Sequence, residues 1–157
     1  MEFIVKLKLS RDYMSESYDQ ARRYGTKWLL VEWIIGISFI LIGLAFYFYL
    51  ESTEIFPLAL VIIGIFELLS NYIKKYFWLR RHAKSKLIDA EVELKVTEIG
   101  IDSRGPYSEG IFRWEGVEKF VRTPRGILLW PQKGMYWYLP DNIAGVQTIE
   151  FIQSKIA

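Results

Sequence analysis

Two carboxylates, Glu32 and Glu67, lie within long apolar stretches of the sequence. Ionisable side chains inside a membrane are costly, and they often handle protons or cations or pair with one another. At helical spacing each carboxylate shares a face with small or polar residues: Glu32 with Gly36 and Gly43, and Glu67 with Gly64 and Asn71. Small residues let two helices approach closely, and polar side chains avoid lipid by facing a neighbouring helix. The pattern predicts two helices packed through these glycines, with a membrane-embedded polar group of Glu32, Glu67 and Asn71.

Two chemical roles are open for the carboxylates. In the first, they form a proton- or cation-handling pair, and the chain must then oligomerise because two helices cannot enclose a pathway. In the second, both side chains reach the nearby membrane surface or pair with Lys27 and Lys74. Both carboxylates are expected near one end of the spans rather than at the midplane, which favours the second role.

The elements that carry these residues are two apolar segments, 28–50 and 55–73. Crossing hydrocarbon takes about 20 helical residues, and Glu32 is the only charged residue of the first segment. The short connection between the segments forces two adjacent, antiparallel helices. The sequence therefore predicts a transmembrane hairpin over 28–73, in preference to buried helices of a soluble core.

Cations flank this hairpin on one side only. Arg22, Arg23 and Lys27 precede the first span, whereas the connecting turn carries only the acids Glu51 and Glu54. An acid-free basic extension over 74–88 follows the second span and contains Lys74, Lys75, Arg80, Arg81, Lys84 and Lys86. Since cations favour the cytoplasmic side, both termini are predicted to be cytoplasmic. The same cations could attract anionic lipid headgroups, although a topology signal alone explains them.

Residues 89–157 change to the period-two alternation of β-strands. Turn signals separate short runs of β-branched and aromatic residues, which predicts six strands: AEVELKV, GIDSR, SEGIFRW, VEKFVRT, GILLWP and MYWYLP. A seventh strand is predicted within 1–10, and it needs a sheet because a lone strand is unstable in water. We assign it to the sheet after the hairpin, since both lie on the same side of the membrane.

Two further helices complete the expected fold. Segment 11–27 is predicted as a short amphipathic juxtamembrane helix, capped by Ser10 or Asp12. An apolar stripe from Ile143 to Ile156, which includes Val146, predicts a terminal helix packed on the sheet. The fold class is then an α+β integral membrane protein. Its transmembrane hairpin is inserted after the first strand of a small, pleckstrin-homology-like antiparallel barrel or sandwich with a C-terminal helix.

Three stretches of this domain carry a resemblance to a known family: EIGIDS, FRWEGVEKFVRT and ILLWPQKGMYWYLPDN. Together with the strand, hairpin and β-domain order, they resemble the YcxB-like family of small bacterial membrane proteins. Trp114 and Val117 fit the family's W-x-x-I segment, and Leu139-Pro140 fit the end of its last strand, where Asp141-Asn142 replace a basic pair. The resemblance implies a fold and a topology, and it implies no general activity. The predicted location is the bacterial inner membrane.

Aromatic residues are concentrated between Trp130 and Tyr138. Strand alternation directs Tyr136 and Tyr138 to one face and Trp137 to the other, so one set is expected to be exposed. A possible partner surface is therefore Trp130, Lys133, Tyr136, Trp137 and Tyr138. A well-filled small barrel is the alternative explanation of the same residues.

Signatures of catalysis are missing from the sequence. The chain has no cysteine and one histidine, His82, and it has no Gly-rich phosphate loop, so neither a metal, a cofactor nor a catalytic residue is predicted. From Asp89 onward ten acids oppose eight bases, and nucleic-acid binding is not expected.

Three functions are compatible with these features. The first is a non-enzymatic, membrane-anchored interaction or regulatory protein with a cytoplasmic domain and a protein partner. The second is an immunity protein that protects against a membrane-acting toxin. The third is an oligomeric proton or cation conductor that uses Glu32 and Glu67.

Overall fold

The structure is a computed structural model, and it describes residues 2–25, 28–49, 55–132 and 135–156. The chain forms two compact units. We call Met1–Gly25 with Arg81–Ala157 the β unit, and Thr26–Arg80 the hairpin unit. The predicted turn with Glu51 and Glu54, and the predicted cation Lys27, lie outside the described residues.

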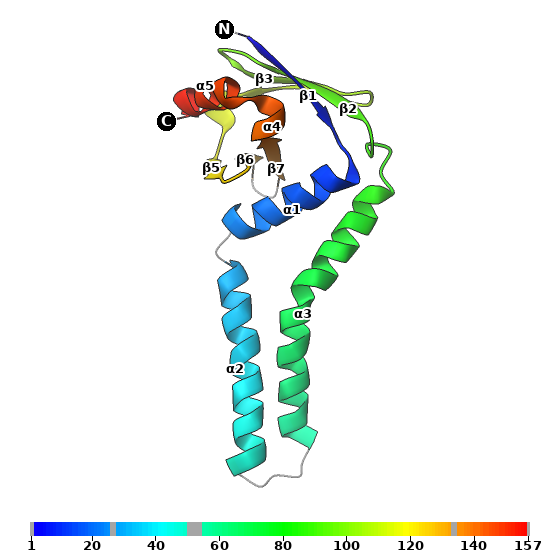
Figure 1. Cartoon of the computed structure of the whole chain (residues 1–157), viewed down its shortest axis with the longest axis vertical. Helices are drawn as coiled ribbons and strands as arrows, with labels where there is room; N and C mark the ends of the chain where they lie inside the picture. The colour runs from blue at the N-terminus through cyan, green and yellow to red at the C-terminus, as the bar shows by residue number, and fades with distance from the viewer. Residues whose placement is uncertain (1, 26–27, 50–54, 133–134, 157) are drawn as a thin grey trace. The chain divides into compact units, whose positions relative to one another are not determined.

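The hairpin unit consists of helix α2 (Trp28–Tyr49) and most of helix α3 (Ile55–Ala83). The two helices run side by side (Figure 1). Both are long and apolar enough to cross a membrane, and α3 continues through the first part of the basic extension before it ends. Only 11% of the apolar window of α2 and 17% of that of α3 is buried. Helices from the core of a soluble protein are mostly covered by the rest of the chain, and these two are not.

The β unit contains seven strands among the described residues, arranged in two antiparallel sheets (Figure 1). The four-stranded sheet has the order β1-β2-β3-β4, with β1 Phe3–Lys8, β2 Glu91–Val96, β3 Gly100–Arg104 and β4 Glu109–Arg113. The three-stranded sheet has the order β5-β6-β7, with β5 Lys119–Thr123, β6 Gly126–Gln132 and β7 Met135–Pro140. A 3-10 turn, η1 (Trp114–Gly116), joins the two sheets.

Strand β1 pairs with β2 although the whole hairpin separates them in sequence. The register runs from Phe3 opposite Val96 to Lys8 opposite Glu91 without interruption. Val5 and Leu7 face the core and are buried, whereas Ile4, Lys6 and Lys8, which alternate with them, are exposed. The first strand of the chain is therefore part of the sheet that the later strands build.

The main core lies between the two sheets and the terminal helices. It is formed by inward residues of both sheets, among them Val96, Ile101 and Leu139, which are fully buried, and by Ile149 and Ile152 of helix α5 (Val146–Ile156). Alternation along the strands supplies these inward positions.

The C-terminal helix differs from the predicted single helix. A short helix α4 (Asp141–Ala144) ends at Gly145, which has a φ of 76°, and α5 begins after it. Glycine adopts this left-handed conformation without steric cost. Because the break changes the helical phase, Ile143 and Val146 are exposed rather than part of the predicted apolar stripe.

Helix α1 (Arg11–Gly25) is capped by Ser10, whose hydroxyl accepts a hydrogen bond from the amide of Tyr13 at 3.2 Å. The helix was expected only to lead into the membrane. Instead it covers the outer face of the three-stranded sheet, where Ala21, Leu128 and Tyr138 form a second small core. The β5–β7 sheet is thus covered on both faces.

Candidate functional site

The first candidate site is the polar group of the hairpin unit. The ammonium nitrogen of Lys74 on α3 lies 3.2 Å from Oε1 of Glu32 on α2 and donates a hydrogen bond to it. Glu67 and Asn71 are half-buried on α3. The ammonium group offsets the charge of the carboxylate within the apolar helix. The contact favours the pairing role of Glu32 over proton or cation transfer.

Close backbone approach holds the two helices of this unit together. A side chain added at Gly64 would lie 2.6 Å from the carbonyl oxygen of Gly36, and one added at Gly43 would lie 2.8 Å from the carbonyl oxygen of Pro57. The three predicted glycines therefore lie at the contact between α2 and α3, where any larger residue would separate the helices.

The basic extension begins on the last turns of α3 and continues past its end. All six of its cations are exposed except Lys75, which is half-buried. Lys84 and Lys86 follow the helix in a segment of turns that ends at Asp89, whose φ is 59°. Apart from Lys74, which is paired with Glu32, the exposed cations are accessible to anions in solvent or at a lipid surface.

The second candidate site is the aromatic stretch of β6 and β7, and here the expectation of an exposed set is wrong. Tyr138 is 1% exposed, and Trp130, Tyr136 and Trp137 are half-buried. One face of the sheet packs under α1 and the other faces the main core, so both sets of aromatic side chains are covered. Lys133, the cation assigned to this surface, lies outside the described residues.

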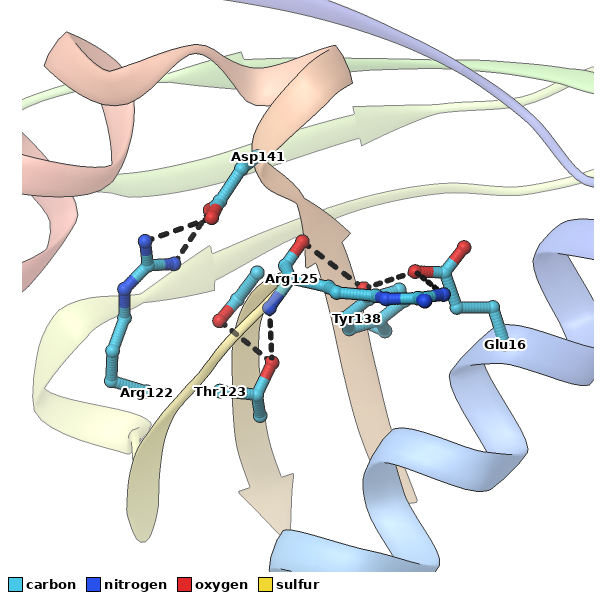
Figure 2. A network of polar contacts seen from close by, with 7 residues as sticks. Glu16, Arg122, Thr123, Arg125, Tyr138 and Asp141 are labelled. Carbon is cyan, nitrogen blue, oxygen red and sulfur yellow. Dashed lines mark hydrogen bonds and ion pairs between the residues drawn. The ribbon is translucent and has the colours of Figure 1, made fainter.

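A polar network fixes α1 to this sheet (Figure 2). The Tyr13 hydroxyl donates a hydrogen bond to the backbone carbonyl of Tyr138 at 2.7 Å. The Tyr138 hydroxyl lies 3.0 Å from Oε1 of Glu16 and 3.2 Å from the carbonyl oxygen of Arg125. The Arg125 guanidinium lies 3.9 Å from the same Glu16 carboxylate. Each hydroxyl buried under the helix thus has a hydrogen-bond partner, as burial requires.

Burial also determines the acidity of these phenols. Desolvation raises the pKa of Tyr13 above its ordinary value, with a smaller contribution from the neighbouring tyrosines. Desolvation, followed by its contact with Glu16, raises the pKa of Tyr138. Both phenols therefore stay protonated at neutral pH and serve as hydrogen-bond donors.

The Leu139-Pro140 corner carries an ion pair on the other side of the sheet. The two terminal nitrogens of Arg122 lie 2.5 and 2.8 Å from the two carboxylate oxygens of Asp141, a bidentate contact (Figure 2). The hydrogen bond to Asp141 raises the pKa of Arg122. Asp141, which stands where the resembled family has a basic residue, thus connects β5 to the start of α4.

A shallow groove lies along β4. The strand forms one wall, and Pro131, Met135 and Trp137 form the other. The rings of Phe112 and Trp137 meet at its floor with centroids 5.9 Å apart. The groove is open and mostly apolar, and within the described residues no cluster of three metal-ligating side chains lies there or elsewhere. Its features suit contact with another polypeptide.

Sequence reasoning missed the docking of α1, although a signal was present. Tyr13, Ser17, Ala21 and Gly25 recur every four residues and form one face of the helix. Ser17, Ala21 and Gly25 are buried, and a side chain at Gly25 would lie 2.7 Å from the ring of Trp130. A stripe of small residues on a polar helix indicates close packing against a sheet.

Comparison with known proteins found no matching family model, no matching curated protein and no matching solved structure.

Proposed function

We propose that the chain is a membrane-anchored, non-enzymatic interaction protein of the bacterial inner membrane. The observation that supports this most strongly is the exposure of α2 and α3. Leu30 and Ile55 are 71% and 82% exposed, and most other large apolar side chains of the two helices are exposed as well. Exposed apolar area of this extent is unfavourable in water and is stabilised by lipid.

The flanking charges support an orientation with both termini in the cytoplasm. Exposed cations follow the apolar part of α3, and cations in short loops favour the cytoplasmic side. In this arrangement the β unit is a cytoplasmic domain with the strand inventory of a pleckstrin-homology-like fold, and anionic headgroups are the lipids that its basic extension meets.

The interaction role is supported by what the β unit offers. Its buried tyrosines stay protonated and hold α1 in place, which is a structural task. Its groove beside β4 is apolar and open, and it lies next to a strand at the end of a sheet. Such an edge binds an extended segment of another polypeptide through backbone hydrogen bonds.

A pair of matched substitutions tests the membrane anchor. Leu41 on α2 and Ile4 on β1 are 61% and 62% exposed. The two positions therefore differ in their proposed surroundings, which are lipid for Leu41 and water for Ile4, and not in their exposure. Leu41→Arg should release a large share of the chain from the membrane fraction, since an arginine near the middle of a span costs about 2.5–3.5 kcal/mol. Ile4→Arg should leave the chain in the membrane. Equal behaviour of the two variants, or a wild-type chain soluble without detergent, would overturn the proposal.

Orientation is tested with reporters fused to each terminus. Both fusions should be active only as cytoplasmic reporters. A periplasmic signal from either fusion contradicts the topology while leaving membrane insertion intact.

A further inference from the structure

The outer face of the four-stranded sheet carries charges of alternating sign. In the register of the sheet, one row crosses all four strands as Lys6, Glu93, Arg104 and Glu109. The next row places Lys95 beside Asp102 and ends at Ile111. Opposite charges on neighbouring strands stabilise pairing. The first row ends at β4 with the acid Glu109, so continued alternation would place a cation beyond it.

The edge of β4 also has unpaired backbone groups. Within the described residues β4 pairs only with β3, and the amide of Trp114 donates to the carbonyl of Ile99 at 3.2 Å. Since antiparallel pairing alternates, even-numbered residues of β4 bond to β3, and the amides and carbonyls of Glu109, Ile111 and Arg113 point away from the sheet. All three side chains are exposed, and Ile111 is 72% exposed.

The sequence of this edge is complementary to itself. When β4 is laid antiparallel to a copy of itself about Ile111, Glu109 faces the Arg113 of the copy, and Ile111 faces Ile111. We propose that β4 is a self-association edge through which two copies of the chain join their four-stranded sheets into one continuous sheet. The Arg113 of the second copy supplies the cation that the charge row lacks.

Space on the inner face allows this pairing. Gly110 then faces the Phe112 of the copy, and no atom lies within 4 Å of the position that a side chain at Gly110 would occupy. The groove beside β4 receives the inner side of the added strand. A second copy thus supplies hydrogen-bond partners for the free backbone groups, opposite charges for Glu109 and Arg113, cover for Ile111 and a side chain for the open space beside Gly110. A different polypeptide would match all four features only if its own sequence happened to supply them.

The proposed contact is small, since it comprises five residues from each copy. Interfaces of this size are weak between freely diffusing proteins. Confinement to one membrane raises the effective concentration of the two copies, and only this strengthening rests on the proposed function. The pairing itself depends on the β unit alone.

Charge exchange tests the register in the full chain reconstituted in lipid vesicles, where both copies are confined to one membrane. Glu109→Lys places lysine against arginine twice, and Arg113→Glu places two glutamates together twice, so each single variant should lose self-association by tenfold or more. The double variant restores opposite charges and should associate like the wild type. A mixture of the two single variants should form heterodimers, because their edges are complementary to each other.

An introduced cysteine tests the axis, since the chain contains none of its own. Ile111→Cys should form an intermolecular disulfide under mild oxidation, because facing hydrogen-bonded residues have Cα atoms about 5.5 Å apart. Ile4→Cys, similarly exposed at the opposite edge of the sheet, is the control and should not cross-link. Self-association that stays unchanged in both single charge variants, or equal cross-linking of the two cysteines, overturns the inference. A chain that is soluble without detergent but still follows the charge exchange would overturn the membrane anchor and leave the edge intact.

Discussion

The hairpin unit and the β unit bury opposite kinds of residue. Where α2 meets α3, Gly36, Gly43 and Gly64 bring the helices close together and pack against side chains such as Ile40 and Leu68, while most other large apolar side chains of the two helices are exposed. In the β unit, large side chains such as Ile101 and Tyr138 fill the interior, and charged residues cover the outside. The same apolar residue types are thus placed outward in one unit and inward in the other. A difference of this kind is what the proposed membrane anchor predicts, since helices surrounded by lipid pack through small residues and a domain in water packs through large apolar ones.

The largest effect is expected from removing a buried ring of the β unit. Tyr138→Ala should destabilise this unit by about 3–5 kcal/mol, because it empties a fully buried site and removes the partner of Glu16. Hydrogen exchange of the β6 amides in detergent measures the loss. Phe66→Ala on α3, whose ring is 61% exposed, is the matched control and should leave the same amides unchanged. Similar effects of the two truncations would remove the distinction between the units.

The hairpin unit should be destabilised by a larger side chain at its helix contact, and not by truncation of its exposed side chains. Gly64→Leu forces a side chain against Gly36 and Ile40 and should cost about 1–3 kcal/mol of helix pairing. A cross-link between α2 and α3 reports the separation, and exchange of the β6 amides should stay constant. Ala45→Leu, at an exposed position of α2, controls for added bulk. Unchanged cross-linking in the glycine variant would argue against close backbone packing.

A smaller effect, dependent on pH, is expected where α1 meets the sheet. Tyr13→Phe removes the hydrogen bond to the Tyr138 carbonyl and should cost about 1 kcal/mol at neutral pH. Because burial raises the folded-state pKa of Tyr13 above its ordinary value of 10.0, the stability linked to its protonation is complete below pH 10 and is lost as pH rises further. The phenylalanine variant should therefore lose less stability than the wild type between pH 10 and pH 11. Parallel alkaline profiles of the two proteins would show that this phenol is not desolvated.

The smallest effect concerns the ion pair of the hairpin unit. A double-mutant cycle of Glu32→Gln and Lys74→Gln should give a coupling of about 0.2–1 kcal/mol, the range of partly exposed pairs. The yield of the same α2–α3 cross-link measures helix pairing in the wild type, the two single variants and the double variant. Glu67→Gln with Lys74→Gln is the comparison cycle and should show weaker coupling. A coupling of zero for the first cycle would show that the contact contributes nothing to the hairpin.

The two apolar helices and the strands could be predicted from the sequence because each depends on a local pattern. Continuous apolar runs gave α2 and α3, and alternation gave strands such as β1 and β2. The assignment of β1 to the sheet after the hairpin followed from the instability of a lone strand, whereas its pairing with β2 came from the structure. These inferences needed no knowledge of distant contacts.

What the sequence did not reveal depends on neighbours in space. Tyr136 and Trp137 were assigned to opposite faces, but the cover that α1 provides over one face was not foreseen. The break at Gly145 was missed because Ile143, Val146 and Ile149 follow one another at intervals of three residues, as on one face of a helix. The charge row across β1–β4 became visible only once the register of four strands was known.

The pairing of β1 with β2 also has a consequence for biosynthesis. The first strand leaves the ribosome before both apolar helices, yet its partner ends only at Val96. At roughly 5 to 20 residues per second, the nascent strand waits roughly 5 to 20 s for that partner to be translated. During this interval the edge of β1 and the side chains of Val5 and Leu7 are uncovered. The proposed membrane anchor would place insertion of the helices ahead of completion of the domain, and a chaperone that shields the amino-terminal strand would have its task in this interval.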